Sequence, residues 1–280
     1  MLWIRALASY SDIAKHDLEA DNGQQSKKHR IHQIGRNGMD HSHDPKDIAK
    51  RLAQGPKINY LRDWIYGGID GAVTTFAIVA GVVGAELSAG IVLILGVANL
   101  VADGFSMAAS NYSGTKAERD DYDRIRQIEL RHIRNSPEGE REELRQIYRA
   151  KGFAGQELED MVDLLSRHEE VWVETMLSEE YGLSNAQRSP TIAALATFIA
   201  FIICGAVPLI PFIMGMQASA IAAAYATGVV FFIIGAMKSN WSTQKWYYSG
   251  IETFIIGMGA AGMAYGIGVL LRGLANGAGI

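Results

Sequence analysis

An apolar run from Gly67 to Ala109 carries carboxylates at Asp70 and Asp103, one on each side of its central turn, and this combination constrains the fold more than any other feature. The short turn Glu86-Leu87-Ser88 divides the run into halves of about 20 residues, the length of helix that crosses a hydrocarbon core of about 30 Å. A carboxylate inside hydrocarbon is costly and usually marks an ion path. The run therefore predicts two antiparallel membrane helices with an ion path along them.

The charged residues are concentrated in two blocks. The chain has 26 Lys and Arg and 30 Asp and Glu among 280 residues, and all but 3 basic and 4 acidic residues lie in Met1 to Asp63 and Asn111 to Pro190. Polar blocks therefore alternate with apolar ones, and the mild mean hydropathy hides the membrane segments.

The apolar blocks divide into five predicted spans, and the fold class is therefore all-α, an integral membrane protein with five transmembrane helices. Pro208 and Pro211 lie near the end of the third span, where kinks are tolerated. The glycines of the last span are expected to serve close helix packing; they are Gly257, Gly259, Gly262, Gly266 and Gly268. The predicted spans are Tyr66 to Ala85, Ala89 to Ala109, Thr191 to Met214, Ala218 to Met237 and Ser249 to Leu271.

The loop charges predict the orientation. The amino-terminal arm, the polar insert and the Lys238 to Lys245 loop carry Lys and Arg, whereas the turns near Glu86 and at Gly215 to Ser219 carry neither. The positive-inside rule then places the amino terminus, the insert and the third loop in the cytoplasm. Met1 to Tyr10 is too short for the apolar core of a signal peptide, so we expect no cleaved leader and a bacterial inner (plasma) membrane.

Four segments follow from this pattern: an arm (1–60), spans one and two (61–110), a polar helical domain (111–189) and spans three to five (190–280). The arm contains five histidines and is expected to be a disordered basic tail on anionic lipid. A loose metal site at His41-Ser42-His43-Asp44 is the alternative. No nucleic-acid partner is expected. The five histidines are His16, His29, His32, His41 and His43.

The polar insert is predicted to contain three helices. The first continues out of the second span and runs from Tyr112 to Arg134. The second begins at Ser136-Pro137, with Ser as cap and Pro in the first position, and ends at Lys151-Gly152. The third runs from Gly155 to Tyr181. Apolar side chains at helical spacing are expected to pack them together; these are Ile125, Ile128, Ile133, Leu144, Tyr148, Met161, Leu164 and Leu165.

Acidic residues on these helices recur at spacings that share one face. Carboxylate, imidazole and thioether together suit a divalent transition metal. A solvated face held by salt bridges is the alternative that spacing alone leaves open. The pairs are Glu129 with His132, Glu140 with Glu143, and Met176 with Glu180.

Three residues of the first two spans could line the translocation path. Asp70 must be ionised to receive a dication and can be protonated when the metal leaves, so one residue could couple metal and proton. Met107 would add a soft sulfur that favours a transition-metal dication over magnesium, with ordinary packing as the alternative. Asp103 lies one turn before Met107 and is either a second path ligand or a partner for a polar group at a dimer interface.

Two motifs of the apolar run resemble the vacuolar iron transporter family. They are Tyr66-Gly-Gly-Ile-Asp70-Gly-Ala-Val-Thr-Thr-Phe-Ala-Ile-Val-Ala-Gly81 and Ala98-Asn-Leu-Val-Ala-Asp103-Gly-Phe-Ser-Met107. The resemblance extends through Pro137-Glu-Gly-Glu-Arg-Glu-Glu-Leu and Glu179-Glu180-Tyr-Gly-Leu183 into the last three spans, and leaves out only the first 60 residues.

The resemblance implies a homodimer that moves Fe²⁺, and often Mn²⁺, out of the cytosol in exchange for protons, with no prosthetic group. It implies that Asp70 and Met107 line the path. His132 stands where the family has a glutamate, so metal binding is expected to weaken as the imidazole is protonated. The family's cytoplasmic metal ligands map onto Glu129, Glu140, Glu143, Met176 and Glu180.

Two alternatives to the exchanger remain. Glu129 and His132 form a Glu-x-x-His pair, the unit of di-iron carboxylate sites, so a dimer could assemble a ferroxidase. The insert could instead be a sensor that gates a passive cation channel. We expect a transporter and not an enzyme.

Overall fold

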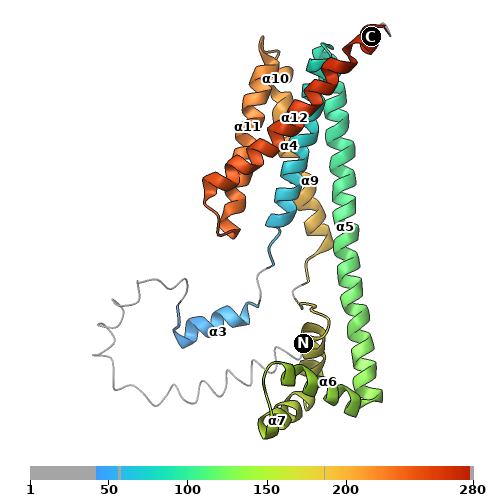
Figure 1. Cartoon of the computed structure of the whole chain (residues 1–280), viewed down its shortest axis with the longest axis vertical. Coiled ribbons are helices and arrows are strands. Elements are labelled where there is room, and N and C mark those ends of the chain that lie inside the picture. Colours follow the sequence, from blue (N-terminus) through green and yellow to red (C-terminus); the bar gives the residue numbers. More distant parts are fainter. Residues whose placement is uncertain (1–41, 56–57, 186, 278–280) are drawn as a thin grey trace, which may run out of the picture. The chain divides into compact units, whose positions relative to one another are not determined.

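The computed structural model describes residues 42–55, 58–185 and 187–277. These residues contain helices and no strand, which confirms the all-α fold class (Figure 1). Residues 1–57 and 58–280 form two separate units. In the second unit, five helical segments are long and apolar enough to cross a membrane, as predicted. These segments are Leu61–Gly84, Ala89–Asn135, Pro190–Ile213, Ser219–Trp241 and Trp246–Gly273.

The described part of the first unit contains helix α3 (Pro45–Ala53). The Asp44 carboxylate caps it by accepting a hydrogen bond from the Lys46 backbone N–H at 3.0 Å, and Pro45 occupies the first turn. This stretch of the arm, expected to be disordered, is therefore helical. Of the five histidines in the arm, only His43 lies within the described residues.

Helices α4 (Leu61–Gly84) and α5 (Ala89–Asn135) are the first two spans. Glu86 allows the tight turn between them by adopting a left-handed backbone with φ 56°, and the Leu87 N–H donates to the Val82 carbonyl at 3.1 Å. Figure 1 shows α5 as one unbroken helix. Its 47 residues rise about 70 Å, so the second span continues into the insert, as predicted.

The third span is interrupted where the sequence predicts a kink. Helix α9 (Pro190–Ala206) is followed by the 3-10 turn η1 (Val207–Leu209) and by α10 (Ile210–Ile213). Pro208 and Pro211 lie in these two short elements, because proline has no N–H for the helical ladder. Helices α11 (Ser219–Lys238) and α12 (Trp246–Gly277) form the last two spans, joined through η2 (Ser239–Trp241).

Helix α4 packs against α5, α9, α11 and α12. Gly67 and Gly71 carry no side chain where the α9 backbone passes at Thr197 and Phe201, and an added Cβ would collide with both carbonyl groups. Small residues allow such close backbone approach between membrane helices. This packing brings Asp63, at the start of α4, close to α9.

The insert contains α6 (Pro137–Ala150), α7 (Gly155–Ser166) and α8 (Glu169–Glu179) beside the end of α5. The prediction of one helix from Gly155 to Tyr181 is wrong, because the chain becomes extended at His168 (φ −121°, ψ 96°). The new helix begins there, with the Trp172 N–H donating to the His168 carbonyl at 2.9 Å.

This break allows both halves of the segment to face one hydrophobic cluster. Leu158 and Val162 of α7 are buried beside Trp172 and Met176 of α8. The predicted stripe on α7 is wrong at Leu164, which is 60% exposed, because the buried face of α7 runs through Leu158 and Val162 and Leu164 lies on another face.

Candidate metal-binding sites

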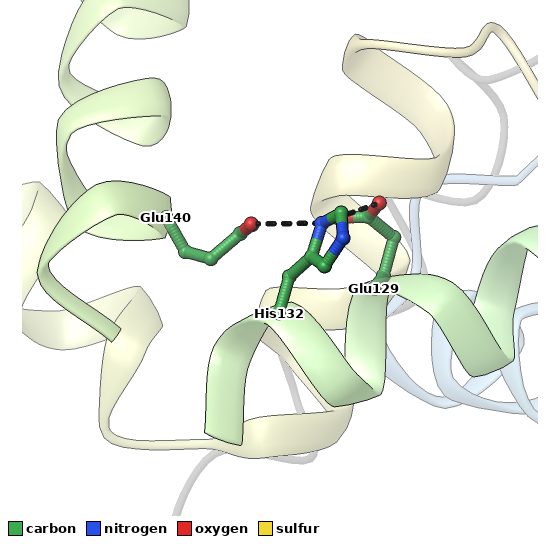
Figure 2. A group of neighbouring side chains, drawn as sticks. All are labelled: Glu129, His132 and Glu140. Atoms are coloured by element: carbon green, nitrogen blue, oxygen red, sulfur yellow. Dashed lines mark ion pairs between the residues drawn. The ribbon is translucent and has the colours of Figure 1, made fainter. Parts of the chain in front are cut away.

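Three predicted ligands meet where α5 turns into α6. Glu129 and His132 lie one turn apart on α5, and the Ser136-Pro137 turn directs Glu140 of α6 back toward them (Figure 2). The His132 Nδ1 atom lies 3.3 Å from Glu140 Oε1 and 3.8 Å from Glu129 Oε1. One ligand atom from each of the three residues lies within 4.8 Å of the others, close enough for one metal ion.

Both carboxylates of this cluster are buried. Glu129 is 1% exposed and Glu140 is 3% exposed, and the Oε2 atom of each has no hydrogen-bond partner. Burying a carboxylate oxygen without a partner is costly. Two unsatisfied oxygens beside an imidazole nitrogen form a donor set that a divalent transition metal would satisfy.

The electrostatics connect this cluster to two further predicted ligands. Burial, and then the negative charges of Glu143, Glu129 and Glu180, raise the pKa of Glu140 to about 7. Burial also raises the pKa of Glu180, and the charges of Glu143 and Glu129 add to this effect. Four carboxylates therefore repel one another around His132, and a bound dication would relieve that repulsion.

Tyr181 joins the cluster although the sequence analysis did not single it out. Its hydroxyl donates a hydrogen bond to Glu129 Oε1 at 3.0 Å. Burial and the hydrogen bond to Glu129 raise the pKa of this phenol. In the sequence, the feature that could have pointed to Tyr181 was its position directly after the predicted ligand Glu180.

Met176 is fully buried in the hydrophobic cluster of the insert. Helix α8 therefore places the predicted ligand Met176 in the hydrophobic cluster of the insert and ends beside the carboxylates, at Glu180. A metal-binding role for the Met176 sulfur stays a prediction.

The three predicted path residues lie on two neighbouring helices. Asp70 of α4 and Met107 of α5 are partly buried, and Met107 packs against the transmembrane core. Asp103 of α5 is exposed on the surface of the single chain. An exposed carboxylate in this region of α5 would meet lipid unless another protein surface covered it.

A polar network at the start of α4 is a second feature that sequence reasoning missed. Asp63 is 1% exposed and accepts hydrogen bonds from Arg188 Nη1 at 2.9 and 3.1 Å and from Asn111 Nδ2 at 3.0 Å. Asn111 also donates to the Thr197 hydroxyl at 2.7 Å. These contacts occupy the amide N–H groups of Asn111 with α4 and α9.

The chain is similar to proteins of known family. A model of the VIT family matches residues 61–269. A vacuolar iron transporter of Toxoplasma gondii is 36% identical over 226 residues, 76% of this chain and 75% of that protein. Vacuolar iron transporter 1 of Oryza sativa subsp. japonica is 32% identical over 210 residues, 74% of this chain and 83% of that protein. Its namesake in Arabidopsis thaliana is 31% identical over 208 residues, 73% of this chain and 83% of that protein.

The family match includes both motifs of the first two spans, the insert and most of the last three spans. It does not cover the amino-terminal arm. The chain therefore belongs to the VIT family and is a membrane transporter rather than an enzyme.

Proposed function

We propose that this protein transports Fe²⁺, and also Mn²⁺, out of the cytosol in exchange for protons. The names of its relatives support iron as the transported metal. The observation that carries the proposal is the pair of buried, unpartnered carboxylate oxygens of Glu129 and Glu140 beside His132. In a metal transporter such a pair is a site that captures the cargo.

The insert would capture the metal before transport. Glu129, His132 and Glu140 would supply the first ligands, and Glu143 and Glu180 would add negative charge and further carboxylate oxygens. Imidazole and carboxylate together favour a transition-metal dication over calcium or magnesium.

The path would run along α4 and α5 past Asp70, Asp103 and Met107. A carboxylate in the membrane can hold either a dication or a proton, but not both at once. Exchange at Asp70 would thus couple export of the metal to entry of protons. The Met107 sulfur would favour ferrous iron over harder ions.

We propose a homodimer in which the α5 surfaces of two chains meet. Asp103 is exposed on α5 together with large apolar side chains such as Val101 and Phe105, which are 59% and 69% exposed. A second copy would cover the carboxylate and enclose the path between the two chains. The lipid bilayer is the other partner.

The orientation proposed from the loop charges puts the amino terminus, the insert and the Lys238–Lys245 loop in the cytosol. For the membrane itself, the expected bacterial inner membrane finds no support in the comparisons, since the relatives are eukaryotic and are named vacuolar. The multi-pass membrane location does not depend on that choice.

The proposal can be tested in inside-out proteoliposomes that contain a pH dye. Wild type should take up Fe²⁺ and Mn²⁺ while the lumen becomes alkaline, because protons leave as metal enters. Asp70→Asn, which keeps the shape but loses the charge, should abolish both signals. Glu252→Gln, at an acid paired with Lys238 at 3.5 Å, is the matched control and should transport normally.

The same assay separates the exchanger from a channel. Metal flux that continues unchanged when a protonophore collapses the pH gradient would contradict proton exchange and favour a metal-gated channel. The ferroxidase alternative is not retained, because the chain belongs to a transporter family.

A further inference from the structure

A large apolar groove lies between α11 and α12, with α4 as its floor. Its volume is about 970 Å³, and its lining contains no charged residue. Small side chains leave the space and aromatic rings bound it. Representative lining residues are Phe76, Val79, Ala224, Phe254, Gly262 and Tyr265.

The groove exists because α12 packs against α11 at one end and against α4 at the other. Near the α11–α12 connection, an added Cβ on Gly235 would collide with the Ser249 carbonyl. Farther along α12, an added Cβ on Gly84 of α4 would collide with the Tyr265 carbonyl. Figure 1 shows α11 and α12 leaving their connection together and separating toward their other ends.

The groove opens to the surroundings of the membrane helices. In the most apolar windows of α11 and α12, only 33% and 17% of the residues are buried within the chain. The lining runs along α12 from Ile251 to Tyr265, which is a rise of about 21 Å. Half of a hydrocarbon core is about 15 Å, so the groove can hold an acyl chain from one leaflet along its length.

We propose that this groove is a lipid-binding site that holds one phospholipid acyl chain. Lipid tails are as apolar as the lining, so the attraction would come from packing rather than from the hydrophobic effect. An unfilled groove loses dispersion contacts, and a flexible linear chain can restore them between diverging helices. A second protein copy is the less suitable occupant, because the exposed carboxylate that needs cover, Asp103, lies on α5.

Gly262 provides a direct test. An added Cβ at Gly262 meets no atom within 4 Å, so Gly262→Leu would fill the groove without displacing the backbone. Gly259, three residues earlier on α12, is equally open but does not line the groove. Gly259→Leu is therefore the matched control.

The full chain would be delipidated in detergent and given phosphatidylcholine with palmitoyl or with hexanoyl tails. Native mass spectrometry would report retained lipid, and thermal unfolding would report stabilisation. Wild type and Gly259→Leu should retain the palmitoyl lipid and unfold at a higher temperature. Gly262→Leu should bind it about tenfold more weakly, with an unchanged lipid-free unfolding temperature.

Several results would overturn the proposal. Equal retention by Gly262→Leu and wild type would show that the groove holds no chain. Equal protection by hexanoyl lipid would assign the effect to the headgroup. Conversion of dimers to monomers by Gly262→Leu would make the groove an interface between copies. None of these outcomes depends on metal transport, so the proposed function is tested separately.

Discussion

Arg188 and Asp63, 125 residues apart in sequence, form an ion pair at the junction of the insert and the spans. The guanidinium of Arg188 lies just before α9, and its Nη1 reaches both oxygens of Asp63 at the start of α4. The Asp63 side chain is 2% exposed and that of Arg188 is 19% exposed. The chain that leaves the insert is thereby tied to the first span.

Removing the cation of this pair should destabilise the protein strongly. Arg188→Gln leaves the Asp63 carboxylate buried with Asn111 as its remaining polar partner. Losing one partner of a buried pair costs about 3 kcal/mol or more. Thermal unfolding of the purified protein in detergent should therefore occur at a clearly lower temperature than for wild type.

The matched control for this prediction is Arg272→Gln. Arg272 pairs with Glu86, but both side chains are substantially exposed. Exposed pairs contribute about 0–1 kcal/mol, so the unfolding temperature should hardly change. Equal effects of the two substitutions would show that burial of Asp63 adds nothing to the strength of its ion pair.

Metal binding at the insert should strengthen as the pH rises. The pKa of Glu140 is raised to about 7, so a metal ion must displace a proton from it below that pH. Apparent Mn²⁺ affinity, measured by calorimetry on the full protein, should fall about tenfold for each pH unit below 7 from this group alone. Glu140→Gln should bind weakly with a flatter pH dependence. An affinity that rises on acidification would contradict this role of Glu140.

The metal-free protein should show the opposite pH dependence in its stability. The unfolded Glu140 carboxyl titrates near 4.5, and the folded one near 7. The folded state therefore binds the proton more tightly, and this stabilisation is fully present below about 4.5 and is lost as the pH rises to about 7. The unfolding temperature should fall over this interval, and the fall should be smaller in Glu140→Gln.

Two measurements complete this stability test. Mn²⁺ at pH 8 should raise the unfolding temperature of wild type, because the dication replaces the lost proton. Glu157→Gln, at an exposed position in the first turn of α7, should keep the wild-type pH profile. A wild-type unfolding temperature that does not change with pH would contradict the conclusion that the carboxylates around His132 repel one another in the metal-free protein.

The spans could be predicted because about 20 apolar residues are needed to cross a bilayer, whatever the tertiary fold. The residues at which these helices begin and end could not be predicted. Helix α4 begins at Leu61, five residues before the predicted start, because Asp63 is satisfied inside the protein by Arg188. In the sequence Asp63 resembles a polar flank, and its partner lies in a distant segment.

The candidate site could be predicted where it depends on local geometry. Glu129 and His132 share a helix face by spacing, and the Ser136-Pro137 turn returns the chain to them with Glu140. Tyr181 was missed because its position depends on the break at His168, which redirects α8. A helix continuous from Gly155 would have carried Tyr181 in another direction.

The surface of α5 should be the contact between two copies of the chain. In a variant whose only native cysteine is removed by Cys204→Ala, Phe105→Cys should cross-link into dimers in membranes through a short bifunctional maleimide. Phe105 is 69% exposed on the same stretch of α5 as Asp103, and apolar surface beside a carboxylate needs a protein cover in the bilayer.

Ile233→Cys is the control for this experiment, since Ile233 is 50% exposed on α11 rather than on α5. It should react with a monofunctional maleimide but give few cross-linked dimers. Because both positions are exposed within membrane helices, a difference between them reports proximity and not reactivity. Dimers from Ile233→Cys and none from Phe105→Cys would move the interface to α11, and Asp103 would then need another partner.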